Sequence, residues 1–212
     1  LMDLWGFTDK NFRQPSKAEI KRVLEFIGTN KIIFNKQDYV VKFTLPEMKV
    51  DLGAIGKGYA VDCAVKKLKD AQIKSCLINA GGQFYCLGDK PRSFLIFDSI
   101  FSKGRGHWKV AIRDPRGKSF DGYLELKDQA VATSGDYEQY FEKDNRRFSH
   151  IMNPRTGYPA VSGIISATVI AADGMTADAL ATSIVVLGKD KGSELVKKFP
   201  GVQTKIIERL DK

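Results

Sequence analysis

The chain is poor in the residues that build metal centres and disulfide frameworks. Its 212 residues include two histidines, His107 and His150, and three cysteines. The number of cysteines is odd, and Cys63, Cys76 and Cys86 lack the spacing of metal ligands. This pattern argues against a disulfide framework and against a zinc site built from His and Cys. We expect Cys63 and Cys76 to be small residues of the core.

Long apolar runs and blocks of like charge are also missing. No apolar stretch reaches the length that spans a bilayer, and no signal peptide is visible. The opening segment 1–7 resembles the interior of a fold, so we expect further sequence upstream. The net charge is +9, from 34 basic and 25 acidic residues, and both signs are spread along the chain. This charge suits an anionic small molecule or an anionic membrane surface better than nucleic acid.

The chain has the composition of a globular protein, with 43% apolar residues and 10% aromatics. Helical and strand patterns mix without strict alternation, which predicts an α+β fold with a largely antiparallel sheet and packed helices. At this length we expect a single domain over residues 1–212. Helices are expected at 18–27, from the glycine-rich turn to about 68, within 171–188 after a turn, and at 190–198. Strands are expected at 31–35, 39–45, 75–78, 94–97, 109–112, 123–126, 129–133, 163–171 and 202–208.

The segment 171–188 predicts a strand end, a turn and then a helix that is almost wholly Ala, Leu, Ile and Val. Either Asp173 or Thr176 can cap the start of this helix. The apolar stripe expected to face the core consists of Leu180, Ile184 and Leu187.

Two polar side chains, Asp178 and Thr182, lie four residues apart on one face of this apolar helix. A carboxylate in such surroundings needs a hydrogen-bond partner, a counter-charge or a metal. A carboxylate oxygen beside a hydroxyl oxygen suits magnesium held together with substrate phosphates. The alternative is that Asp178 is a charge favoured by the helix dipole and that Thr182 bonds to the backbone.

A glycine-rich turn follows a short strand at residues 50–58 and leads into a helix. Backbone amides at this helix start could meet an anion, with Lys57 adding positive charge. The turn is not a Walker A loop, because Gly58 stands where Ser or Thr would hold the metal, and it lacks the dinucleotide fingerprint. A plain strand-to-helix turn is the alternative interpretation.

Three further turns carry polar residues. The small residues at 79–83 allow a close approach to the backbone, although a bulge or turn explains them equally well. Ser134 and Gly135 could line a pocket or cap a helical turn. His150 is expected in an alternating strand before a Pro-Arg-Thr-Gly turn, where a single His is more often structural than catalytic.

Six segments occur together in the order and spacing of one known family. They are Leu4–Phe7, Asp51–Asp62, Asn79–Gly82, Ala132–Gly135, His150–Gly157 and Ala177–Thr182. Together they resemble the FAD:protein FMN transferases, the ApbE-type flavin transferases once labelled thiamine-biosynthesis lipoproteins. The resemblance covers essentially the whole chain. It implies a single-domain flavin transferase-like fold whose N-terminal third lies outside this sequence.

Members of that family split FAD at its pyrophosphate and attach FMN through a phosphoester to a Thr or Ser of an acceptor protein. They release AMP and use magnesium. The resemblance therefore implies a magnesium-dependent transferase with FAD as substrate and a flavoprotein subunit as partner. Bacterial members are usually exported and tethered by lipid, so it also implies a membrane-associated, extracytoplasmic location, in the periplasm or at the cell surface.

The resemblance also assigns roles to single residues. Asp178 and Thr182 look like metal ligands, joined by the carbonyl groups of Ala54 and Ala181. The residues that resemble contacts to the flavin nucleotide are Asp51, Lys57, Asn79, Ser134 and the backbone around Met152. His150 resembles the residue suggested as base, and Asp178 is the alternative base. The chain departs from the family at Asn153, where Asp is common, and at Gly56, which is often Ala.

This assignment is chemically consistent, because phosphoryl transfer needs neutralised phosphate charge, a positioned nucleophile and a good leaving group. Magnesium and Lys57 would neutralise the phosphate charge, and a base would activate the attacking hydroxyl by taking its proton. Two rival interpretations keep the site: a hydrolase that uses water and yields FMN and AMP, and a protein that binds FAD without turnover. The rival from another class is a nucleic-acid-binding domain, which steeply salt-dependent DNA binding would support.

Overall fold

The computed structural model describes residues 1–91 and 106–209. The chain divides into two compact units, Leu1–Asp51 with Asp136–Val161, and Leu52–Gly135 with Ser162–Lys212. Helices and strands mix in both, and the described strand pairs are antiparallel, which confirms the α+β fold class. The expected strand at 94–97 lies outside the described residues, and the single domain over 1–212 stays a prediction. Within the described residues, no helix combines the length and apolarity needed to cross a membrane.

The first unit holds short helices and two hairpins. Its elements are α1 (Met2–Trp5), α2 (Lys17–Leu24), a 3₁₀ turn (Thr29–Lys31), β1 (Ile32–Asn35), β2 (Val40–Phe43), β8 (Tyr140–Lys143) and β9 (Arg146–Ser149). The buried side chains of Trp5, Phe7 and Ile20 form its core, with Phe141 and Phe148 packed against them. Trp5 donates its indole N–H to the carbonyl of Gly157 at 2.9 Å, so the one polar atom of this buried ring is satisfied.

Helix α2 begins at Lys17, one residue before the expected start. The Ser16 hydroxyl accepts from the Glu19 amide while the Glu19 carboxylate accepts from the Ser16 amide, which is a complete capping box. The helix ends at Leu24, three residues before the expected Ile27. Bonds of the tighter i to i+3 type then carry the chain on as far as Ile27.

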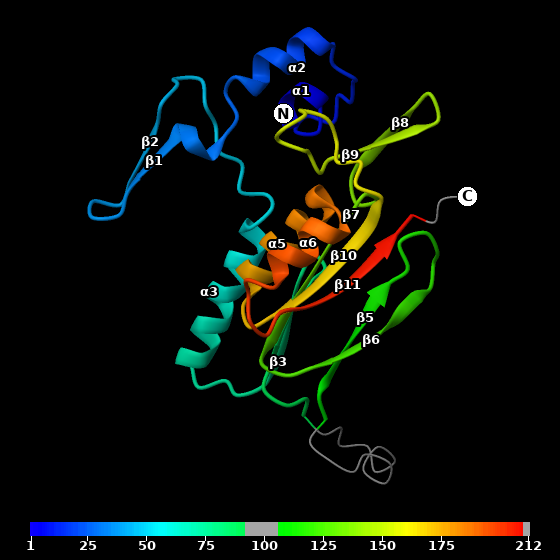
Figure 1. Cartoon of the computed structure of the whole chain (residues 1–212). Coiled ribbons are helices and arrows are strands. Elements are labelled where there is room, and N and C mark those ends of the chain that lie inside the picture. The colour runs from blue at the N-terminus through cyan, green and yellow to red at the C-terminus, as the bar shows by residue number, and fades with distance from the viewer. Residues whose placement is uncertain (92–105, 210–212) are drawn as a thin grey trace. The chain divides into compact units, whose positions relative to one another are not determined.

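The second unit is built on one five-stranded antiparallel sheet in the order β11-β10-β7-β4-β3 (Figure 1). Its strands are β3 (Cys76–Ala80), β4 (Gln83–Leu87), β7 (Gln129–Gly135), β10 (Ile164–Ala171) and β11 (Gln203–Glu208). The hairpin of β5 (Trp108–Arg113) and β6 (Phe120–Leu126) forms a separate two-stranded sheet. The helices are α3 (Gly56–Asp70), α5 (Gly174–Leu187) and α6 (Lys189–Val196).

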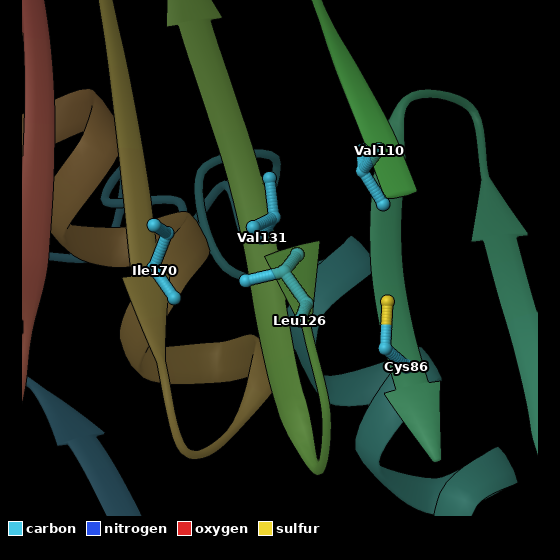
Figure 2. Packing of buried hydrophobic residues seen from close by; sticks show 5 residues of the cluster. All are labelled: Cys86, Val110, Leu126, Val131 and Ile170. Atoms are coloured by element: carbon cyan, nitrogen blue, oxygen red, sulfur yellow. The ribbon is translucent and has the colours of Figure 1, made fainter. Parts of the chain in front are cut away.

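One face of this sheet packs on the β5–β6 hairpin. Ile170 of β10 and Val131 of β7 are direct cross-strand partners, and both point into the cluster drawn in Figure 2. The other members of this buried cluster are Cys86, Val110 and Leu126. Thr133 and Thr168 share the same face by the two-residue period of a strand, and their hydroxyl groups bond to each other at 2.8 Å.

The opposite face carries α3 and α5. Alternation turns Ala132 and Ser134 of β7 toward the helices, together with Ala167 and Val169 of β10. All eight residues of β10 are buried because both of its faces are covered. That double coverage explains why apolar residues occupy both faces of the strand, and why its two polar residues, Ser166 and Thr168, are buried as well. It also means that a polar side chain on the helix-facing surface, such as Ser134, must find its partner inside the protein.

Three expectations about burial are wrong. Cys63 is exposed and Cys76 is only half-buried, whereas Cys86 is fully buried. The buried face of α3 is set by Gly58, Val61 and Val65, and Cys63 lies off that stripe, while Cys76 lies on the edge strand β3. On α5, Leu180 and Ile184 are buried, but Leu187 is 37% exposed because it is the last residue of the helix.

Two strands, β4 and β8, were not anticipated, and the sequence places His150 in a strand that in fact ends one residue earlier, at Ser149. Both missed strands are short and follow turn residues directly, which hides their alternation. The short strand expected before the glycine-rich turn is also wrong, because residues 48–52 form no helix or strand. The remaining expected helices and strands within the described residues are present with ends shifted by one to three residues, which is the usual uncertainty of element boundaries.

Candidate functional site

Helix α5 begins where β10 delivers the chain to the edge of the sheet. Asp173 is its N-cap: one carboxylate oxygen accepts from the Thr176 amide at 2.7 Å and the other from the Thr176 hydroxyl at 2.9 Å. Of the two capping residues that the sequence offers, the structure therefore uses Asp173. This cap fixes the first turn, and with it the direction in which Asp178 points one turn later.

Asp178 is the centre of the candidate site. It is only 2% exposed, yet its carboxylate is satisfied: Oδ2 accepts from the backbone N–H of Gly58 at 3.0 Å. Oδ1 lies 3.8 Å from the ammonium nitrogen of Lys57. The sequence predicts that this carboxylate needs a hydrogen-bond partner, a counter-charge or a metal, and the structure supplies the first two. The alternative of a carboxylate held by the helix dipole alone does not describe this contact.

The glycine-rich turn brings the start of α3 against the start of α5. A Cβ added to Gly58 would lie 2.3 Å from the carbonyl oxygen of Gly174, and one added to Gly174 would lie 2.7 Å from that of Gly58. Real side-chain atoms do not approach so closely, so both positions require glycine for direct backbone contact. At Gly56 a Cβ would meet nothing within 4 Å, which fits a family in which this position is often Ala.

Thr182 lies one turn beyond Asp178 on α5, and its hydroxyl contacts that of Ser134 at 3.0 Å. The sequence offers a bond from Thr182 to the backbone as an alternative, but the contact found in the structure is with a side chain of β7. Ser134 reaches α5 because alternation along β7 turns it to the helix-covered face. The two hydroxyl groups and the Asp178 carboxylate therefore present oxygen atoms along one face of α5, and oxygen atoms are the ligands that hard cations prefer.

Asn79, Ala54 and Ala181 have less specific surroundings. Asn79 closes the β3–β4 turn, where its side-chain oxygen accepts from the Gly82 amide at 3.0 Å; this is the turn interpretation of that segment. Ala54 lies in the exposed, non-helical turn before α3. Ala181 is buried in the middle of α5, where the helix ladder uses one lone pair of its carbonyl oxygen.

Asp51, His150 and Met152 belong to the first unit. The His150 ring packs edge-on against Phe7, and its Nδ1 lies 3.1 Å from the Gln139 carbonyl oxygen. A carbonyl can only accept, so Nδ1 is the donor in this contact. Met152 packs on the aromatic core of this unit, and Asp51 is exposed.

Two residues escaped sequence reasoning although they stand inside quoted motifs. Asp62 of α3 accepts from the Gly174 amide at 2.6 Å and from the Met175 amide at 2.9 Å. Gln83 of β4 is 1% exposed and donates from its amide nitrogen to the Gly174 carbonyl at 2.7 Å. Each is a polar residue in a segment of mostly small or apolar residues. Such a residue, if buried, requires a hydrogen-bond partner, and this could have singled it out from the sequence.

The donor set favours a hard divalent cation over a soft one. In the described part of the chain there is no group of three or more His, Cys, Asp and Glu side chains placed to hold a metal. Along one face of α5 lie the Asp178 carboxylate and the paired hydroxyls of Thr182 and Ser134, which are oxygen ligands of the kind that magnesium accepts when phosphates and water complete its shell. The residues present therefore fit a magnesium ion shared with a bound diphosphate.

Comparisons with known proteins match one family over most of the chain. The model of the ApbE family matches residues 1–206. The chain is 32% identical over 205 residues to the FAD:protein FMN transferase of Haemophilus influenzae, covering 93% of this chain and 56% of the relative. To the enzyme of the same name in Treponema pallidum it is 38% identical over 173 residues, covering 80% and 46%. The chain thus spans about half the length of these curated relatives.

Solved structures agree with the fold described above. The ApbE protein of Thermotoga maritima is 37% identical with a TM-score of 0.82, covering 98% of this chain and 67% of that one. The apo flavinyl transferase ApbE of Pseudomonas stutzeri is 30% identical with a TM-score of 0.80, covering 99% and 61%. The motif order, the contact of Lys57 with Asp178 and these matches lead to one conclusion: the chain belongs to the ApbE family.

Proposed function

We propose that this chain carries the catalytic site of a magnesium-dependent FAD:protein FMN transferase. In the proposed reaction a Thr or Ser hydroxyl oxygen of an acceptor protein attacks the phosphorus on the FMN side of the FAD pyrophosphate. The new P–O bond forms as the bridging P–O bond breaks, AMP leaves with that oxygen, and the hydroxyl proton passes to a base. The observation that carries the proposal is the placement of Lys57 and the Gly58 amide beside Asp178.

The residues divide the work by charge. Lys57 and the N-terminal amides of α3 form the positive side of the site, which suits the oxygens of a diphosphate. Asp178 and Thr182, with the carbonyls of Ala54 and Ala181, would hold magnesium. The ion, when bound, would neutralise charge that builds up on the phosphates as the bond breaks. Ser134 holds the Thr182 hydroxyl in place, and the flavin-nucleotide contacts at Asp51, Asn79 and Met152 belong to the same proposal.

Two groups are candidates for the base. Both oxygens of Asp178 are already engaged, one by the Gly58 amide and the other by the Lys57 ammonium group. His150 has its proton placed on Nδ1 by the Gln139 carbonyl, which makes Nε2 the nitrogen that accepts a proton. The proposal therefore assigns the base to His150 and a binding role to Asp178.

The test is the intact mass of a candidate acceptor protein after incubation with the chain, FAD and magnesium. Transfer adds one FMN to the acceptor and releases one AMP. Asp178→Asn retains an oxygen that can accept from Gly58 but removes the charge, so we expect transfer to fall on the order of 10²-fold. Asp190→Asn makes the same chemical change at an exposed position on α6 and serves as the control.

Other outcomes separate the rival functions. Steady AMP release over many turnovers without an acceptor identifies a hydrolase, and bound FAD that survives with magnesium identifies a binding protein. Normal transfer by Asp178→Asn would contradict the metal assignment. An extracytoplasmic, lipid-anchored location is part of the proposal, and it is tested by fractionating cells that produce the native protein and detecting it in the membrane fraction.

A further inference from the structure

A second polar contact joins α3 to α5, and the reaction proposed above makes no use of it. The Asp62 carboxylate accepts hydrogen bonds from the amides of Gly174 and Met175, one on each oxygen, at 2.6 Å and 2.9 Å. Both amides belong to the first turn of α5, where backbone N–H groups have no partner within their own helix. A side chain of one helix thus caps the start of the other with two charge-assisted bonds.

The two contacts form two rungs between α3 and α5, in each of which a carboxylate of one helix accepts from backbone amides at the start of the other. In α3, Asp62 follows Gly58 by four residues; in α5, Gly174 precedes Asp178 by four residues. The rungs are therefore one turn, about 6 Å, apart on each helix. On one rung the amide of α3 donates to the carboxylate of α5, and on the other the amides of α5 donate to the carboxylate of α3.

Packing between the rungs leaves the helices little freedom to shift. Gly58 and Gly174 meet backbone to backbone, without side chains that could adapt. A Cβ on Gly174 would also lie 3.0 Å from the Asp62 carboxylate and 3.2 Å from the amide nitrogen of Gln83. Gln83 donates to the Gly174 carbonyl, so this residue is held from α3 and from the sheet at once. Rotation of α5 is then set by contacts one turn away from Asp178.

We propose that Asp62 is a positioning residue for the candidate site. Asp62 fixes the position of α5 along α3. It thereby sets the distances from the Asp178 carboxylate to the Lys57 ammonium group and to the Gly58 amide. A displacement of about 1 Å in such a site is enough to cost a large factor in rate. The effect of Asp62 on the rate of transfer rests on the proposed function. Its effect on the contact between α3 and α5 does not.

The test compares two isosteric variants at the same helix start. Asp62→Asn replaces one accepting oxygen by an NH₂ group that cannot accept from Met175. Asp173→Asn makes the same change in a residue whose bonds stay within α5. Both remove one negative charge beside the N-terminus of α5, so they share the loss of the dipole interaction. Only the first weakens the link to α3.

The first readout is amide hydrogen exchange of Gly58 in the protein alone. Asp62→Asn should speed exchange at Gly58 at least tenfold beyond any change in globally protected amides, while Asp173→Asn should not. The second readout is the magnesium concentration that half-saturates FMN transfer. It should rise about tenfold for Asp62→Asn, in line with other residues that support metal ligands, and stay unchanged for Asp173→Asn.

Equal Gly58 exchange in the two variants would overturn the inference, and so would an unchanged magnesium requirement in Asp62→Asn. If the chain shows no transfer at all, the proposed function fails, yet the exchange result still decides the role of Asp62. Should Asp62→Asn not fold, native-state exchange of the unmodified protein replaces it. The amides of Gly58, Gly174 and Met175 should then open together with one denaturant dependence, and independent opening would contradict the link.

Discussion

Lys57 Nζ lies 3.8 Å from Asp178 Oδ1, and the next amide along the chain, that of Gly58, donates to the other oxygen of the same carboxylate. Gly58 and Asp178 are 120 residues apart in sequence. This contact brings together the two motifs on which a flavin-transferase interpretation depends. A carboxylate buried elsewhere in the core, away from the glycine-rich turn, would have left neither motif with a chemical role.

The contact between α3 and α5 predicts that the two glycines of the turn differ sharply. Gly58→Ala forces a Cβ to within 2.3 Å of a backbone oxygen, so the free energy of unfolding should fall by about 1–3 kcal/mol. Gly56→Ala meets open space and should be neutral or stabilising by at most about 1 kcal/mol. Urea denaturation measures both. Equal effects of the two substitutions would mean that the helices do not meet through Gly58.

The hydroxyl pair of Ser134 and Thr182 predicts a change in the magnesium requirement. Ser134→Ala leaves Thr182 without its partner, which should cost about 1 kcal/mol of stability and raise the half-saturating magnesium concentration about tenfold. Thr133→Val is the matched control, because it removes one hydroxyl of the Thr133–Thr168 pair on the other face of the same strand. The control should lose similar stability with no change in magnesium dependence. A shift in both variants would point to general loosening of β7.

The capping box of α2 predicts a loss of stability in acid. Hydrogen bonds from the Ser16 amide and hydroxyl, and then from Arg13, lower the pKa of Glu19 to about 2. Because this pKa is lower in the folded state than in the unfolded chain, the stabilisation is present above the unfolded value near 4.5 and is lost as the pH falls toward 2. Glu19→Gln removes the titration. The stability difference between the two proteins should shrink from pH 5 to pH 2, and parallel curves would contradict this account.

The three thiols should react in the order of their exposure. Cys63 is exposed on α3, whereas burial raises the pKa of the Cys86 thiol to about 11 and also raises that of the half-buried Cys76. At pH 8, iodoacetamide followed by peptide mass spectrometry should label Cys63 first and Cys86 only after unfolding. Cys63→Ser should remove the fast phase. Early labelling of Cys86 would show that the core between the sheet and the β5–β6 hairpin opens readily.

The family could be identified from the sequence, because the motifs that carry it are local and their order is preserved. Asp178 and Lys57 could be singled out for the same reason, since a carboxylate in an apolar helix and a lysine in a glycine-rich turn are both unusual. Their mutual contact could not be read from the sequence, because no local pattern relates residues so far apart. Asp62 and Gln83 were missed because their hydrogen-bond partners at the start of α5 are 91 to 113 residues away in sequence.

The sequence by itself determined the features that depend on neighbours along the chain: the presence of α2, the turn that leads into α5, and the strand before that turn. Backbone hydrogen bonding and side-chain period act over a few residues, so these patterns are visible without a fold. The tertiary structure decided which surfaces are covered, and so exposed Cys63 and buried Cys86. It also decided that the polar groups of α3 and α5 satisfy one another, because only the packing of two helices on one sheet face removes water from both.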